Sequence, residues 1–240
     1  MKKRIVIAMN GLIVAFTLLG IGIMLYKNGN EGGLLSSSGW ENFKYFTVLS
    51  NVYCGITAGV FLIRLIVHAR GKDKLTVEKK ADTDGPTAVL ERKTQSSDYP
   101  LWLLIMKLAA AAAVTVTFLV VACFFGPLYT YPVLYKGSNL WFHLIIPLLG
   151  MIEFCLLEGE IPFRMTFLTG APALVYGCFY LGNILINGKG DWPDTNDWYG
   201  FMNWGFGVAM VIFAVIVLTS WGAACMLRFI NRKVTHRINK

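Results

Sequence analysis

Residues 43–51 read Phe-Lys-Tyr-Phe-Thr-Val-Leu-Ser-Asn and open an apolar segment that continues to about residue 68. In a helix, Thr47, Ser50 and Asn51 follow an i, i+3, i+4 spacing and share one face. A polar side chain in an apolar helix costs free energy unless it is paired or faces a polar cavity. Three polar groups within five positions therefore indicate a buried polar site at the start of this segment.

The segment is one of six apolar runs, each long enough to cross a hydrocarbon core of roughly 30 Å. Hydrophobic residues make up 55% of the 240 residues and charged residues 15%, and the mean hydropathy is +0.55. This composition lies outside the range of soluble domains. The sequence predicts one all-α domain, 1–240, an integral membrane bundle of six transmembrane helices. The expected spans are about 5–26, 44–68, 100–125, 140–157, 163–186 and 204–229.

Lysine and arginine predict the orientation of this bundle, because cytoplasmic loops retain them. Seventeen of the 22 lie on the side that holds the N-terminus, and Lys107 lies within the third span. Both termini are therefore expected to be cytoplasmic, in a multi-pass protein of the plasma membrane. The first run exceeds the roughly 7–15 apolar residues of a signal peptide, and no Ala-x-Ala site follows, so we expect an uncleaved span. Only four basic residues lie on the side opposite the N-terminus, namely Lys27, Lys44, Lys136 and Lys189.

Several function classes find no support in the sequence. The net charge is +8, but the basic residues lie between apolar blocks, so no nucleic-acid partner is expected. The five cysteines lie inside apolar blocks without CxxC spacing, which argues against a disulfide framework or a zinc site. The acidic stretch 191–197 lacks the spacing of an EF-hand calcium loop, and a solvated loop is the simpler interpretation. We expect no metal and no cofactor, and the sequence does not specify an oligomeric partner.

The long segment 69–99 is expected to be a cytoplasmic loop. Lys74–Glu78 and Thr87–Glu91 flank Asp82-Thr-Asp-Gly-Pro86, a pattern that fits a short hairpin because glycine permits the positive φ of the turn. Disorder is an equal alternative, since an isolated two-stranded hairpin is marginally stable in water.

Small residues predict close packing between spans. Gly55 and Gly59 form a GxxxG motif on the second span, and five consecutive alanines, 109–113, lie on the third. Both patterns allow helix backbones to approach closely. We interpret the motif as packing within the chain, with dimerisation as the alternative. Pro147, Pro162 and Pro172 are expected to bend or begin their helices.

A second polar island, Asn139 to His143, lies at the start of the fourth span. If spans two and four both run inward and span five runs outward, Thr47, Asn51, His143 and Asn183 reach a similar depth in the outer half of the membrane. A neutral histidine is useful there, because one ring nitrogen accepts a hydrogen bond while the other donates one. The alternative is that Thr47 bonds its own helix backbone and that His143 only ties helices together.

The residues of both islands resemble a known family. Residues 45–51, and the pattern Asn139-x-x-x-His143-x-x-x-Pro147 followed by Glu153, resemble the androgen-induced protein family. Its mammalian members are multi-pass hydrolases of fatty acid esters of hydroxy fatty acids, and many bacterial relatives have no settled function. The resemblance covers the six-span layout and these two motifs, with little identity between them.

The resemblance implies an activity and a catalytic pair. The family's proposed pair is a threonine at the start of the second span and a histidine on the fourth, which correspond to Thr47 and His143. The implied reaction is acyl transfer to Thr47, with His143 as general base and then acid, on a lipid or fatty-acyl ester. No aspartate lies in the outer halves of the spans, so an amide would have to orient His143. The supporting candidates, some of which could also donate to the oxyanion, are Ser50, Asn51, Asn139 and Asn183.

A rival function comes from another class of protein. The same polar cavity would serve a non-catalytic lipid-binding or transport-like membrane protein, whose partners would again be membrane lipids or acyl chains.

Two charged residues lie well inside spans. Lys107 and Glu153 are expected at nearly equal depth in the inner half, where an unpaired charge costs several kcal/mol. We predict a structural ion pair, separate from the outer site. The alternatives are a Lys107 that extends to the headgroups and a protonated Glu153.

Overall fold

A computed structural model describes residues 2–26, 39–79, 99–191 and 195–238. Within these ranges the chain is helical and has no strand. Six helices are long and apolar enough to cross a membrane, which confirms the predicted architecture and indicates a multi-pass membrane protein. The boundaries agree closely with expectation, except that the last span continues further. The spans are Lys3–Tyr26, Phe46–His68, Leu101–Leu128, Ser138–Leu156, Phe163–Asn187 and Phe206–His236.

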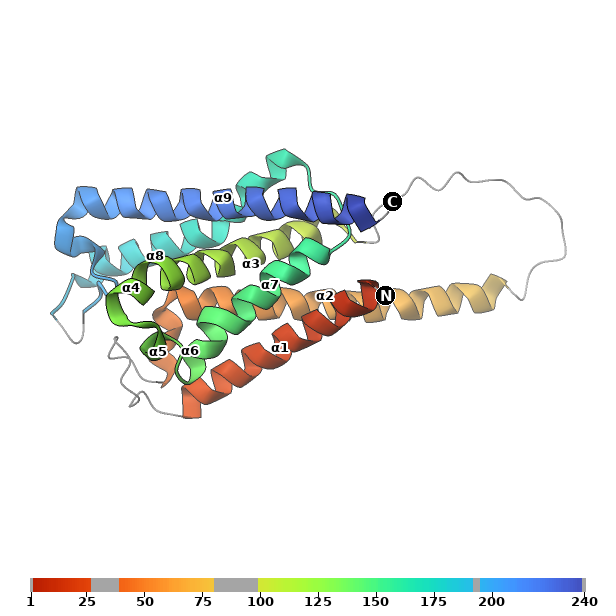
Figure 1. Cartoon of the computed structure of the whole chain (residues 1–240), viewed down its shortest axis with the longest axis horizontal. Helices are drawn as coiled ribbons and strands as arrows, with labels where there is room; N and C mark the ends of the chain where they lie inside the picture. The colour runs from red at the N-terminus through yellow and green to blue at the C-terminus, as the bar shows by residue number, and fades with distance from the viewer. Residues whose placement is uncertain (1, 27–38, 80–98, 192–194, 239–240) are drawn as a thin grey trace.

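The spans form one elongated bundle, in which the first and last described residues lie at the same end (Figure 1). The opposite end, called the loop end below, carries η1, the short helices α4 to α6 and residues 195–205. The elements are α1 Lys2–Tyr26, η1 Gly39–Lys44, α2 Phe46–Lys79, α3 Leu101–Leu119, η2 Val120–Phe125, α4 Gly126–Tyr129, α5 Tyr131–Leu134, α6 Ser138–Leu140, η3 Trp141–Ile145, α7 Ile146–Leu156, η4 Phe163–Gly170, α8 Ala171–Asn187, η5 Phe201–Trp204 and α9 Phe206–Ile238.

Helix α3 lies at the centre of the bundle. It packs against α2, α7, α9 and η4, and also touches α8. All five alanines of 109–113 are buried. Their small side chains let the neighbouring backbones approach, which is how helices gain packing energy when lipid offers them no hydrophobic driving force.

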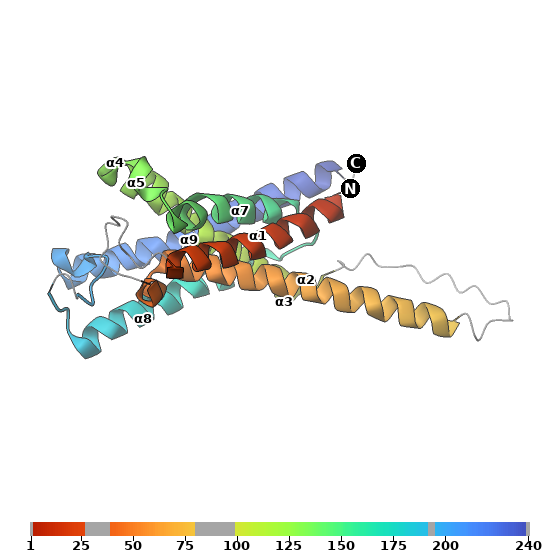
Figure 2. The ribbon, with the colours of Figure 1, turned by 90° about the horizontal axis from the view of Figure 1, so that it is seen from below.

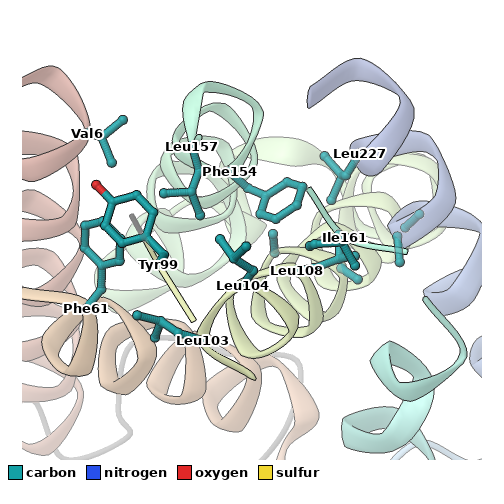
Figure 3. Close-up of a cluster of buried hydrophobic side chains, with 14 residues drawn as sticks. Val6, Phe61, Tyr99, Leu103, Leu104, Leu108, Phe154, Leu157, Ile161 and Leu227 are labelled. Carbon is teal, nitrogen blue, oxygen red and sulfur yellow. The ribbon is translucent and has the colours of Figure 1, made fainter. Parts of the chain in front are cut away.

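A cluster of large apolar side chains holds five spans together. Val6, Phe61, Leu104, Phe154 and Leu227 come from α1, α2, α3, α7 and α9, and all are buried (Figure 3). Relative to lipid, the gain from this cluster is close packing rather than transfer out of water.

The prolines determine where the helices change their winding. A proline ring clashes with the carbonyl of the residue four positions earlier, and it lacks the N–H that would bond there. Four residues before Pro147 lies His143, inside the π-helical turn η3, where the Ile146 N–H bonds to the Trp141 carbonyl. Pro172 likewise follows the 3₁₀ turn η4, and Pro162 precedes it. The expected effect of these prolines is confirmed.

The interpretation of 69–79 as part of a loop is wrong. Helix α2 continues to Lys79 and extends past the bundle (Figure 2), so Lys74–Glu78, the first arm of the expected hairpin, is helical. Valine and threonine suit a strand, but the helix that already runs through His68 needs no new nucleus to continue. The turn 82–86 and the second arm 87–91 lie outside the described residues.

The GxxxG motif packs within the chain, as expected. A Cβ added to Gly55 would lie 2.7 Å from Oγ1 and 2.9 Å from Cβ of Thr17 on α1, whereas one added to Gly59 would lie 3.9 Å from Val14. Gly55 is therefore the position at which α1 and α2 approach most closely within the motif.

We expect Gly55→Ala to lower the free energy of unfolding by about 1–3 kcal/mol, because Thr17 and its backbone must move away. Gly59→Ala is the matched control on the same helix, and it should be neutral or slightly stabilising because alanine favours the helix. Unfolding in detergent, followed by circular dichroism, compares the two. Equal losses in both variants would contradict this account of the packing.

Candidate functional site

Thr47 lies in the first turn of α2, directly after the bend at Tyr45, and its side chain is half-buried. Its carbonyl accepts hydrogen bonds from Ser50 Oγ at 3.1 Å and from Asn51 Nδ2 at 2.6 Å. Among the described residues its hydroxyl has no hydrogen-bond partner and its backbone N–H has no acceptor. The expected face of Thr47, Ser50 and Asn51 therefore exists, but the two neighbours bond to the backbone of Thr47 rather than to its hydroxyl.

Asn51 joins the start of α2 to the turn that carries His143. Its side chain is fully buried, and its Nδ2 also donates to the Phe142 carbonyl, at 2.8 Å. Both acceptors are carbonyls, so the orientation of the amide is fixed and both hydrogens are used. Its Oδ1 is buried without a partner. Both amide hydrogens of Asn51 are thus engaged in this structure, so the predicted role of Asn51 as oxyanion donor finds no support in it.

His143 lies in η3 and is half-buried. Its Nδ1 lies 2.7 Å from the Leu134 carbonyl, at the end of α5. Because a carbonyl only accepts, Nδ1 carries the hydrogen, and in the neutral ring Nε2 keeps its lone pair. The expectation that an asparagine orients this ring is wrong, because a backbone carbonyl does so. Residue type alone gives no signal for such a partner.

Thr47 and His143 are not joined by a hydrogen bond in the described structure. Their turns are connected through Asn51, which bonds to Thr47 itself and to the residue before His143. Catalytic hydrogen bonds are often long or incomplete before substrate binds.

The other predicted supporting residues have different partners. Ser50 Oγ lies 2.9 Å from Thr117 Oγ1 and so ties α2 to α3. Asn139 bonds through its backbone N–H to the Lys136 carbonyl. Asn183 donates to Asn196 and accepts from Asn187 at the loop end. Of the predicted supporting residues, Ser50 and Asn51 therefore bond to the turn of Thr47, whereas the amide of Asn183 bonds to other residues at the loop end. Helix depth alone says nothing about the direction in which a side chain points.

A second polar cluster lies near the other end of the bundle. Lys107 Nζ is 2.8 Å from Glu153 Oε2, so the expected ion pair is present, and both side chains are buried. The sequence reasoning missed its third member. Asn10 on α1 accepts from Lys107 at 2.8 Å and donates to Glu153 Oε1 at 2.7 Å. The cluster therefore joins α1, α3 and α7, and Asn10 was detectable as a lone amide in the first apolar run.

The loop end holds a group of aromatic and acidic residues that sequence reasoning treated as a solvated loop. Asp197 is buried, accepts from the Tyr180 hydroxyl, and accepts from the Met202 N–H at 3.0 Å. Both of its carboxylate oxygens are thus used by the protein. Among the described residues, no group of three His, Cys, Asp or Glu side chains is placed to hold a metal ion.

No family model, no curated protein and no solved structure matches this chain.

The Lys107 and Glu153 pair predicts non-additive losses of stability. Lys107→Met and Glu153→Gln should each destabilise by about 3–5 kcal/mol, since each strands a buried charge or acceptor. The double variant should be more stable than the sum of the single losses implies. Unfolding in detergent measures all three, and strictly additive losses would refute the coupling.

The contact of His143 predicts its tautomer. In protein labelled with ¹⁵N-histidine, the His143 resonance should show a protonated Nδ1 and an unprotonated Nε2 at neutral pH. The resonance is assigned by its disappearance in His143→Gln, and His68 and His236 serve as exposed references. An Nε2-protonated His143 would contradict the bond to Leu134.

Proposed function

We propose that this protein is a membrane-embedded hydrolase of lipid esters, with Thr47 as nucleophile and His143 as general base. The observation that carries the proposal is the bond from His143 Nδ1 to the Leu134 carbonyl. This bond gives the ring a fixed orientation and leaves Nε2 as the basic nitrogen. The Leu134 carbonyl thus orients the histidine as a carboxylate does in serine hydrolases. The likeness of both motifs to the androgen-induced protein family supports the same pair.

The proposed reaction has two acyl-transfer steps. In the first, Thr47 Oγ1 attacks the ester carbonyl while its proton passes to His143 Nε2, which then protonates the departing alcohol. The product is a threonyl ester on the protein. In the second step, water attacks this ester, gives one proton to His143 Nε2 and releases the fatty acid. That proton then returns to Thr47 Oγ1.

The backbone N–H of Thr47 is the best candidate to stabilise the oxyanion. It lies in the first turn of α2 and has no acceptor among the described residues. The N-terminus of a helix favours negative charge, and the N–H of the nucleophile itself serves as an oxyanion donor in serine proteases. This assignment replaces the amide donors expected from the sequence.

The proposed substrate class is suggested by the apolar surface of the spans. The six spans expose many large apolar side chains, which suit the acyl chains of a bilayer. With the termini in the cytoplasm, as the basic residues predict, the loop end faces outward and Thr47 meets esters of the outer leaflet.

The second candidate function is a lipid-binding protein without catalysis. The observation that favours it is the missing hydrogen bond between Thr47 and His143. The two functions differ in what an ester does on binding: a hydrolase requires Thr47 and His143 to come within hydrogen-bond distance, whereas a lipid-binding protein does not.

An acylating activity-based hydrolase probe tests the proposal. The probe should label the wild type and Thr47→Ser but not Thr47→Ala. Labelling of His143→Gln should be slower than that of the wild type by about 10²-fold or more. Thr57→Ala is the matched control, because Thr57 is a buried threonine on the same helix that only bonds to the Cys54 carbonyl. Labelling of Thr47→Ala, or an unlabelled wild type that still binds lipid, would favour the non-catalytic function.

A further inference from the structure

The bend between η1 and α2 leaves two backbone groups to be satisfied by side chains. The first N–H groups of a helix have no partner within the helix, and at this bend the Phe46 N–H lies one residue before Thr47. This N–H donates to the Tyr199 hydroxyl at 2.9 Å. On the other side of the bend, the Lys44 carbonyl accepts from the Tyr176 hydroxyl at 2.7 Å.

The two tyrosines come from different parts of the chain and hold the bend from both sides. Tyr176 lies on α8 and also accepts from Trp198 Nε1 at 3.0 Å. Tyr199 lies in the loop that follows α8, and its ring packs edge-on against that of Tyr176, with centroids 6.4 Å apart. Burial, and then the neighbouring Tyr176, raise the pKa of Tyr199 well above its usual range. Its hydroxyl therefore stays protonated and neutral.

The loop that carries Tyr199 is anchored in turn. Asp197 is buried and accepts from the Tyr180 hydroxyl and the Met202 N–H. Its own carbonyl accepts from the Gly200 N–H at 2.8 Å, which closes the turn around Tyr199. These hydrogen bonds fix the loop before and after Tyr199, and with it the hydroxyl that accepts from the Phe46 N–H.

We propose that Tyr199 and Tyr176 are positioning residues, which fix the first turn of α2 and thereby the direction of the Thr47 hydroxyl. This proposal rests on the function proposed above. Thr47 has no side-chain hydrogen bond of its own, so its direction depends on the backbone of its turn. A displacement of a reacting group by about 1 Å can cost about 10²-fold in rate.

The test compares Tyr199→Phe with the wild type and with Tyr53→Phe. Tyr53 lies on the same helix and its hydroxyl makes only a 3.5 Å contact with the Met106 carbonyl, so it controls for loss of a phenol. In Tyr199→Phe, amide exchange of Phe46, whose N–H loses its acceptor, should accelerate by about fivefold or more when measured in detergent by mass spectrometry. Tyr53→Phe should leave it unchanged. Tyr176→Phe, which frees the Lys44 carbonyl, provides a second variant should Tyr199→Phe fold poorly.

The kinetic readout separates positioning from stability. Tyr199→Phe should lower kcat of ester hydrolysis by about 10–100-fold per folded molecule while KM stays nearly constant, since the substitution changes the position of Thr47 rather than the binding of the ester. An unchanged kcat with faster exchange, or unchanged exchange at Phe46, overturns the proposal. If the wild type is not a hydrolase, the proposed function fails on its own. Exchange at the Phe46 amide then decides whether Tyr199 holds this turn.

Discussion

The hydrogen-bond requirement of polar groups in an apolar interior is the constraint on which this fold depends. Water is absent there, so each N–H, carbonyl or charge needs a partner from the chain itself. Asn51 meets the requirement for two carbonyls at once, those of Thr47 and Phe142. Asn231 on α9 does the same at the end of α7, where it donates to the carbonyls of Phe154 and Leu157. Single amides therefore fix where neighbouring helices meet.

The same constraint explains why the chain leaves regular α-helix where it does. Pro147 cannot bond to His143 and would collide with its carbonyl, so the preceding turn widens into η3. The widened turn carries the His143 ring toward the Leu134 carbonyl. The proline thus contributes to the site through the geometry of the backbone, although its own side chain takes no part in the proposed chemistry.

Local pattern predicted the spans and failed for the contacts between distant segments. The length and apolar content of each run determine a membrane helix almost alone, and the match in depth of Lys107 and Glu153 followed from helix rise. Asn183 shows the limit, because the correct depth did not place its amide beside Thr47. The partners that matter most, the Leu134 carbonyl and the Tyr199 hydroxyl, lie in loops. Their position depends on tertiary packing that no periodicity in the sequence records.

The two polar clusters share the fourth span, Ser138–Leu156, which the change of winding before Pro147 divides into two parts. Glu153 holds α7 to Lys107 and Asn10, while His143 lies ten residues earlier, about 15 Å along the axis at 1.5 Å per residue. Pro147 and the end of the π-helical turn that contains His143 lie between them. The ion pair anchors the part of the span beyond Pro147, whereas His143 lies in the π-helical turn before it. If the protein is the hydrolase proposed above, this interruption of the α-helix is the place at which the base would close on Thr47 when an ester is bound.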